Sequence, residues 1–181
     1  MSRGSPAFVI PARLTVAELA GAIGVGIEAV SAELEARDEP STPSDLVSGP
    51  LAVSVASALG CEVSVEPRDL ALEQLYELET SGHWAEEPEG RAGRLSRGVA
   101  SRLDELDEHI EQVSEHWSVS RMPLIDRNVL RIALFELLED PETPTGVVIS
   151  EAVRLAQTYS TERSGPFVNG VLATLARTVR D

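Results

Sequence analysis

The sequence predicts a mainly α-helical protein in which a small strand–three helices–strand module precedes a helical bundle. Two observations carry this prediction. From about residue 67 onward, apolar residues recur at steps of three or four in five successive stretches, which is the spacing of one helix face. Before that point, two short β-like runs flank three helical stretches. We therefore expect one domain over residues 1–66 and a second over residues 67–181.

The first part opens with a strand and a capped helix. Phe8–Ile10 is a short apolar run that Pro11 stops, which is typical of a brief strand. Thr15 is followed three residues later by Glu18. This spacing is that of a capping box, in which each side chain accepts a hydrogen bond from the backbone N–H of the other residue. We therefore expect a helix to begin here and to end at Gly24.

Two more helices and a second strand complete the first part. Apolar spacing predicts a helix over 27–36, and a polar loop with two prolines follows. Ser44 or Asp45 can cap a third helix that ends at Gly60. Residues 61–66, CEVSVE, alternate apolar and polar side chains as a half-buried strand does. We expect the two strands to pair and close the module.

The second part is predicted to be helical to its end. A helix begins at Asp69, and a polar stretch with glycines and a proline predicts a loop over 82–93. One long helix follows, from Leu95 to Trp117. Pro123 suits the first turn of a helix that is apolar on most sides and is therefore central. Two last helices, over about 148–159 and 167–179, complete a compact five-helix bundle.

The composition excludes several classes of function. No run of about 18 apolar residues occurs, so we expect no membrane span. The single cysteine cannot form an internal disulfide, which fits a cytoplasmic protein. The net charge of −15 argues against broad nucleic-acid binding, which needs a basic face, and we expect no DNA binding.

Patterns for catalysis and metal binding are weak. His109 and His116 lie too far apart for a helical pair of metal ligands, and no thiol cluster accompanies them. Neither a GxSxG nucleophile elbow nor a GxxxxGK[ST] phosphate loop occurs in the sequence. We therefore expect a binding protein rather than an enzyme, with no cofactor and no metal.

Four ordered blocks in the second part carry a resemblance to a known family. They are Trp117, RMPLIDRNVLRIALFELL from Arg121, VVISEAVRLAQTYST from Val147, and ERSGPFVNGVL from Glu162. In this order and with these gaps they resemble the C-terminal half of the NusB transcription antitermination family. The resemblance covers about residues 68–180 and implies an all-α antitermination domain. Because the stretch 82–93 is short, a helix usual in the family is expected to be missing or reduced there.

The first part is similar to the small N-terminal module of bacterial translation initiation factor two. The similarity lies in LTVAELAGAIGVGIEAVSAELEA, followed by the third helix and GCEVSVE. The GTPase part of that factor has no counterpart in this sequence.

The NusB resemblance implies a role in transcription antitermination. Family members pair with ribosomal protein NusE, and the pair holds boxA-type single-stranded RNA. This helps the transcription elongation complex to read through terminators, especially on ribosomal RNA operons. An alternative is a protein-only adaptor that keeps NusE binding and has lost RNA affinity, which the acidic balance favours. A third possibility is an enzyme-associated domain, because NusB-like bundles also precede ribosomal RNA methyltransferases. We do not expect this role, since the sequence shows no cofactor-binding domain.

The resemblance implies RNA-binding residues at the starts of the first and last helices of the bundle. Arg68 stands where the family has a cluster of basic residues, and Pro166 stands where it has a basic residue. The start of the last helix, where free backbone N–H groups favour a phosphate, contributes Ser164, Gly165, Phe167 and Asn169. Phe167 could equally stack on a base or fill the core.

Other arginines could compensate for the missing basic residues. Arg94 and Arg97, with Arg91, recur at steps of three and form a candidate phosphate patch. The alternative is a solvated face that balances nearby acids. Arg127, with Arg131 four residues on, is a further candidate, and the alternative for both is a structural ion pair.

Overall fold

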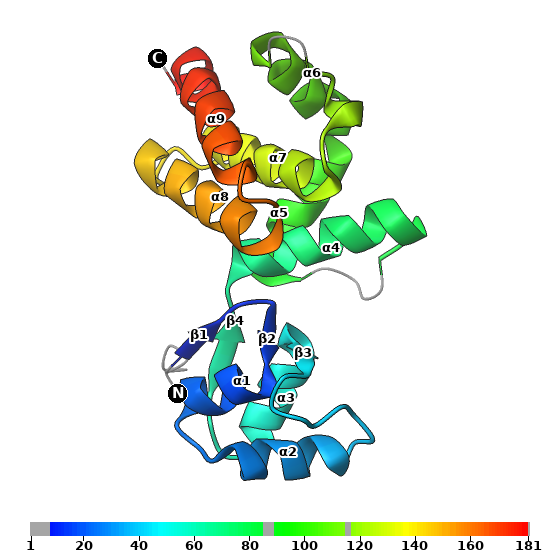
Figure 1. Cartoon of the computed structure of the whole chain (residues 1–181). Helices are drawn as coiled ribbons and strands as arrows, with labels where there is room; N and C mark the ends of the chain where they lie inside the picture. The colour runs from blue at the N-terminus through cyan, green and yellow to red at the C-terminus, as the bar shows by residue number, and fades with distance from the viewer. Residues whose placement is uncertain (1–7, 85–88, 115–116, 181) are drawn as a thin grey trace. The chain divides into compact units, whose positions relative to one another are not determined.

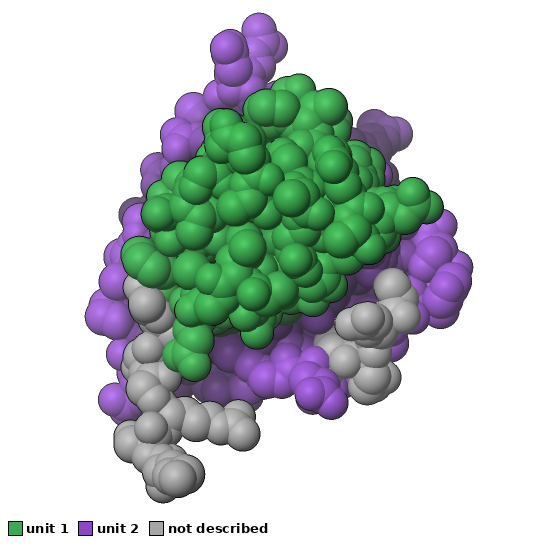
Figure 2. Space-filling view, turned by 90° about the horizontal axis from the view of Figure 1, so that it is seen from below, with its two compact units in different colours: residues 1–70 green, residues 71–181 purple. Residues whose placement is uncertain are grey.

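The protein was analysed as a computed structural model that describes residues 8–84, 89–114 and 117–180. The chain divides into two compact units, residues 1–70 and 71–181 (Figure 2). Each unit has an apolar core of its own. The division falls within the first turn of helix α4 (Pro67–Ser81), which follows the last strand of the first unit directly.

The first unit combines four short strands with three helices (Figure 1). Strand β1 (Phe8–Ile10) pairs in parallel with β4 (Val63–Val65), so the predicted closure of the module by its first and last strands is confirmed. The remaining elements are β2 (Arg13–Thr15), α1 (Val16–Ile23), α2 (Ile27–Glu35), β3 (Leu46–Ser48) and α3 (Gly49–Ala58).

The capping box of α1 is confirmed. The backbone N–H of Glu18 donates to Oγ1 of Thr15 at 3.2 Å, and the backbone N–H of Thr15 donates to Oε2 of Glu18 at 2.7 Å. These bonds hold the pKa of the Glu18 carboxyl below its usual range, with the bond from the Thr15 backbone as the largest cause. Two of the N–H groups that have no partner at a helix start are thereby satisfied.

The start of the third helix was predicted wrongly. α3 begins at Gly49 after Ser48, and neither Ser44 nor Asp45 caps it. Residues 46–48 are instead extended and pair antiparallel with β2, a second sheet that the sequence did not indicate. The Asp45 side chain accepts from the backbone N–H of Thr42 at 2.8 Å, so it shapes the preceding turn.

The second unit is a bundle built around one central helix (Figure 1). Its described elements are α4, α5 (Gly90–Ser101), α6 (Leu103–Val113), the 3-10 helix η1 (Val119–Arg121), α7 (Leu124–Glu139), α8 (Thr145–Tyr159) and α9 (Ser164–Arg180). α7 packs against α5, α6, α8 and α9. Its residues from Asn128 to Leu137 are all buried, so the predicted central position of this helix is confirmed. The mainly α-helical fold is confirmed as well.

The predicted single helix from Leu95 to Trp117 is in fact two helices. The break lies at Arg102, whose φ of −131° leaves the helical region, and α6 already ends at Val113. The apolar spacing continues across the break because both helices bury one face in the same core, so periodicity could not reveal it. α5 also begins at Gly90, inside the predicted loop, whose residues 85–88 lie outside the described part. No described helix is long and apolar enough to span a membrane.

Candidate functional site

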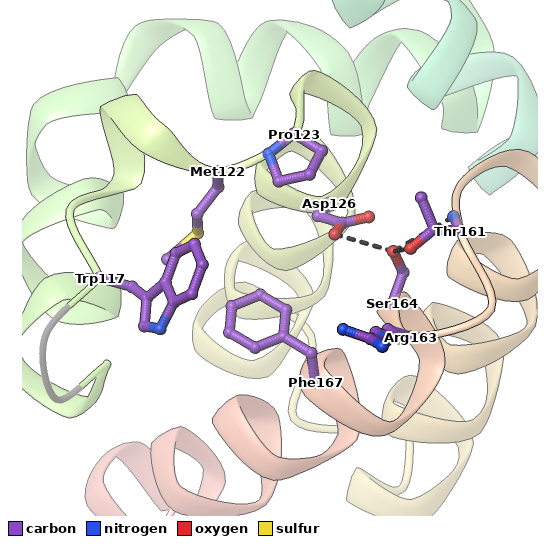
Figure 3. A pocket seen from close by; sticks show the side chains of 8 residues that line it. All are labelled: Trp117, Met122, Pro123, Asp126, Thr161, Arg163, Ser164 and Phe167. Atoms are coloured by element: carbon purple, nitrogen blue, oxygen red, sulfur yellow. Dashed lines mark hydrogen bonds between the residues drawn. The ribbon is translucent and has the colours of Figure 1, made fainter.

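Two aromatic side chains from distant parts of the chain meet beside the start of α9. Trp117 lies between α6 and η1, and Phe167 lies in the first turn of α9. Their ring centroids are 6.4 Å apart and their planes are tilted by 55° (Figure 3). Trp117 is 56% exposed, whereas Phe167 is half-buried. We call these two residues the aromatic pair.

Two pockets adjoin the aromatic pair. One, of about 280 Å³, is lined by Met122 and Pro123 from the segment before α7 and by Arg163 from the segment before α9 (Figure 3). The other, of about 320 Å³, lies towards Val113 and Gly170. Trp117 and Phe167 line both pockets. An exposed indole that lines two pockets offers a flat apolar surface on which a planar group can stack.

The polar side of the first pocket joins α7 to α9. The hydroxyl of Ser164 donates to Oδ2 of Asp126 at 2.9 Å (Figure 3), and both residues are buried. Ser164 also accepts from the backbone N–H of Thr161 at 3.3 Å. The Oδ1 atom of Asp126 is buried and has no hydrogen-bond partner among the described residues. Ser164, a predicted RNA ligand, is therefore already engaged in positioning the start of α9.

The start of α9 offers few N–H groups to a phosphate. The N–H of Ser164 donates to the carbonyl of Thr161 at 2.9 Å, and that of Phe167 donates to the carbonyl of Arg163 at 3.3 Å. Pro166 has no N–H. Gly165 is buried, and a Cβ there would lie 2.9 Å from Cγ of Gln157, so this glycine permits close packing of α8. Of the predicted set in this helix, only Asn169 is exposed.

The structure pairs Arg127 and Arg131 with acids rather than leaving them free. Nη2 of Arg127 lies 2.6 Å from Oε2 of Glu79. Arg131 is buried between Asp107 and Glu79. Burial disfavours the charged form of Arg131, but the hydrogen bonds and charges of these two carboxylates outweigh it and raise the pKa of Arg131. The ion-pair alternative therefore describes the positions of both arginines.

The other predicted arginines lie away from the aromatic pair or are buried. Arg68 is only 8% exposed, and its Nη1 lies 3.5 Å from Oε1 of Glu66. Arg94 is exposed on α5, where Nη2 donates to the carbonyl of Glu139 at 3.4 Å, and Arg97 is exposed on the same helix. Glu139 ends α7, whereas Pro123 at the pocket precedes it. A helix of this length spans about 24 Å, so the structure does not bring Arg94 to the pocket.

Sequence reasoning missed two of the residues that line the site. Trp117 served only to identify the family, and Arg163 was not singled out. Arg163 directly precedes the SGPF motif that holds Phe167, and it is exposed. In a chain with twice as many acids as bases, an arginine beside a motif aromatic is a signal that could have identified it.

Comparison with known proteins identifies the family. The model of the NusB family matches residues 64–177. This chain belongs to the NusB family. A "Transcription antitermination protein NusB" from Acidothermus cellulolyticus is 55% identical over 82 residues, 45% of this chain and 57% of the relative. Another, from Sorangium cellulosum, is 42% identical over 123 residues, 60% of this chain and 88% of the relative.

A solved structure extends the likeness to the fold. The crystal structure titled "Antitermination Factors NusB and NusE in complex with dsRNA" matches with a TM-score of 0.51 and 27% identity, over 62% of this chain and 94% of that one. The NusB relatives are named as transcription antitermination proteins, which agrees with the prediction of a binding protein rather than an enzyme.

Proposed function

We propose that this chain is a NusB-type transcription antitermination factor that binds a NusE partner and boxA-type single-stranded RNA. The observation that carries the proposal is the aromatic pair at the start of α9, in which an exposed Trp117 and a half-buried Phe167 line two pockets. Proteins that recognise single-stranded RNA stack unpaired bases on aromatic side chains. The matched complex of NusB with NusE and double-stranded RNA supports NusE and RNA as partners.

Stacking can provide much of the affinity that the missing basic cluster does not. Base–aromatic stacking contributes about 1–3 kcal/mol per base. One base on the exposed face of Trp117 therefore offsets part of the loss of the surface phosphate contacts. The net charge of −15 opposes binding to nucleic acid in general, so we expect affinity to depend on unpaired bases and on the partner.

The alternative function is a protein-only adaptor that binds NusE and has lost RNA affinity. Three observations favour the adaptor, because each removes a phosphate contact that the resemblance implies. Arg68 is buried, Arg127 is paired with Glu79, and position 166 is a proline.

We propose that the first unit is similar to the N-terminal module of bacterial translation initiation factor two and has a separate binding role. Three helices closed by a β1–β4 pair support this proposal. We also propose a domain boundary between residues 66 and 67, and that the protein acts in the cytoplasm, attached to the transcription elongation complex.

The test is a titration of labelled boxA-type RNA with this protein, alone and mixed with NusE, at low and physiological salt. Tight binding that requires NusE and weakens at least tenfold in Phe167→Ala supports the antitermination function. A stable complex with NusE and no RNA affinity at either salt would instead establish the adaptor.

A further inference from the structure

Nearly all described arginines are held by partners within the protein. Their side chains form ion pairs, hydrogen bonds to carbonyls or other interactions. The guanidinium groups of Arg121 and Arg163 are the exceptions among the described residues, where neither makes a hydrogen bond or an ion pair, and both are exposed. The chain carries thirty acidic residues, and neither of these two guanidinium groups has an acidic partner among the residues that the structure describes.

These two arginines belong to the segments that carry the aromatic pair. Arg121 ends η1, four residues after Trp117 and directly before Met122, which lines the first pocket. Arg163 lines that pocket and lies four residues before Phe167 (Figure 3). Each ring of the pair therefore has an exposed guanidinium in its own segment.

From this placement we infer that Arg121 and Arg163 are the phosphate contacts of this site, and that they hold the backbone of a single-stranded RNA whose base stacks on Trp117. The inference rests on the proposed function and specifies which side chains perform it. A guanidinium matches phosphate oxygens with two parallel hydrogen bonds, and an arginine without an internal partner loses no ion pair when it binds one.

The chemistry of the site favours RNA over an acidic protein segment. An acidic peptide would use the two cations but would leave the exposed indole and its two pockets without a planar partner. Single-stranded RNA supplies a phosphate and a base in each nucleotide, so it fits both features. The arginines predicted from sequence are poorer phosphate ligands here, because Arg68 and Arg127 would first have to leave Glu66 and Glu79.

Salt dependence separates phosphate contacts from other contributions. Each phosphate contact to a single strand adds about 0.7 to the slope of log affinity against log salt concentration. The experiment measures the affinity of the protein–NusE complex for fluorescein-labelled boxA-type RNA between about 50 and 200 mM salt. Over this range, two phosphate contacts make the affinity fall by an additional factor of about seven. We expect Arg121→Ala/Arg163→Ala to lose that extra weakening, and Arg121→Lys/Arg163→Lys to retain it.

Two controls make the outcome decisive. Arg94→Ala/Arg97→Ala removes the patch on α5 and should leave the slope unchanged, as should Arg177→Ala on α9. An unchanged slope in Arg121→Ala/Arg163→Ala, with wild-type RNA affinity present, overturns the assignment and leaves the proposed function standing. Loss of NusE binding in that variant, measured without RNA, would overturn the assignment and assign the surface to protein contact. Absence of RNA affinity in the wild type at 50 mM salt would overturn the RNA-binding function itself.

Discussion

Arg131 on α7 donates from Nε and Nη2 to the two carboxylate oxygens of Asp107 on α6, each at 2.7 Å. Its Nη1 donates to Glu79 on α4 and, at 3.0 Å, to Oδ1 of Asn128. One buried guanidinium therefore ties three helices together. Arg131, a candidate RNA ligand by its sequence motif, has a structural role in this fold: it links helices through buried ion pairs.

Substitution Arg131→Ala should destabilise the second unit by about 3 kcal/mol, because it leaves two carboxylates without their shared cation in a mostly buried site. Urea unfolding followed by tryptophan fluorescence measures this, since Trp84 and Trp117 both lie in the second unit. Arg177→Ala is the matched control, because Arg177 is exposed and bonds only within α9. If Arg131→Ala lowers the free energy of unfolding no more than Arg177→Ala does, Arg131 does not stabilise the contacts between these helices.

Arg180 caps the C-terminal end of α7. Its guanidinium donates to the carbonyls of Glu136, Leu137, Asp140 and Thr143 at 2.7–3.1 Å. Helix C-termini leave carbonyls without partners and carry partial negative charge, so a cation there is favourable. Arg180→Ala should lower the urea-unfolding free energy by about 2 kcal/mol, and Arg180→Lys should recover only part of it. Full recovery of wild-type stability in Arg180→Lys would show that the charge alone matters and not the fork of hydrogen bonds.

Gly98 allows α5 and α7 to approach closely. A Cβ at this position would lie 2.2 Å from Cζ of Phe135. Gly98→Ala should therefore destabilise the bundle by about 1–3 kcal/mol, although alanine is the better helix former. Gly170→Ala in α9 meets nothing within 4 Å and should stabilise by up to about 1 kcal/mol. Partial recovery of thermal stability in Gly98→Ala/Phe135→Leu would confirm the clash, and no recovery would refute it.

The capping box of α1 should make the first unit sensitive to acid. The pKa of Glu18 is lowered in the folded protein by its bonds to Thr15. A lowered carboxyl pKa contributes stability that is present above the unfolded value of about 4.3 and is lost as the pH falls through the folded value. In Thr15→Ala, the Glu18 pKa measured by NMR titration should rise only in part, because the hydroxyl of Thr15 is lost while the backbone N–H at position 15 can still donate. Amide exchange in α1 should become faster, consistent with loss of a cap that contributes about 1 kcal/mol. An unchanged Glu18 pKa would contradict the capping role.

Local signals in the sequence were sufficient for most of the helices and for the closure of the first unit. The Thr15–Glu18 spacing and the alternation at Val63–Val65 depend only on neighbours along the chain, and both led to correct elements. The break at Arg102 and the sheet at Leu46–Ser48 were missed, because tertiary partners determine them. Arg102 bonds to Glu139 at 2.5 Å, and β3 exists by pairing with β2.

The candidate site was harder to predict because its residues come together only in the fold. Phe167 was identified from its motif, whereas Trp117 meets it across fifty residues of chain. Which arginines are available to a ligand depends on which acids pair with the others. No sequence spacing reports that Glu79 engages Arg127 or that Arg163 has no such partner among the described residues.

The measurement that tests RNA binding at the aromatic pair most directly is the fluorescence of Trp117 in a Trp84→Phe variant as RNA is added with NusE. Trp117 is then the single indole of this chain, and a variant or homologue of NusE without tryptophan keeps the signal specific. We expect single-stranded boxA-type RNA to quench this fluorescence in step with binding followed by anisotropy of a labelled RNA. Saturation of the anisotropy with no change in Trp117 fluorescence would contradict stacking of RNA at this site.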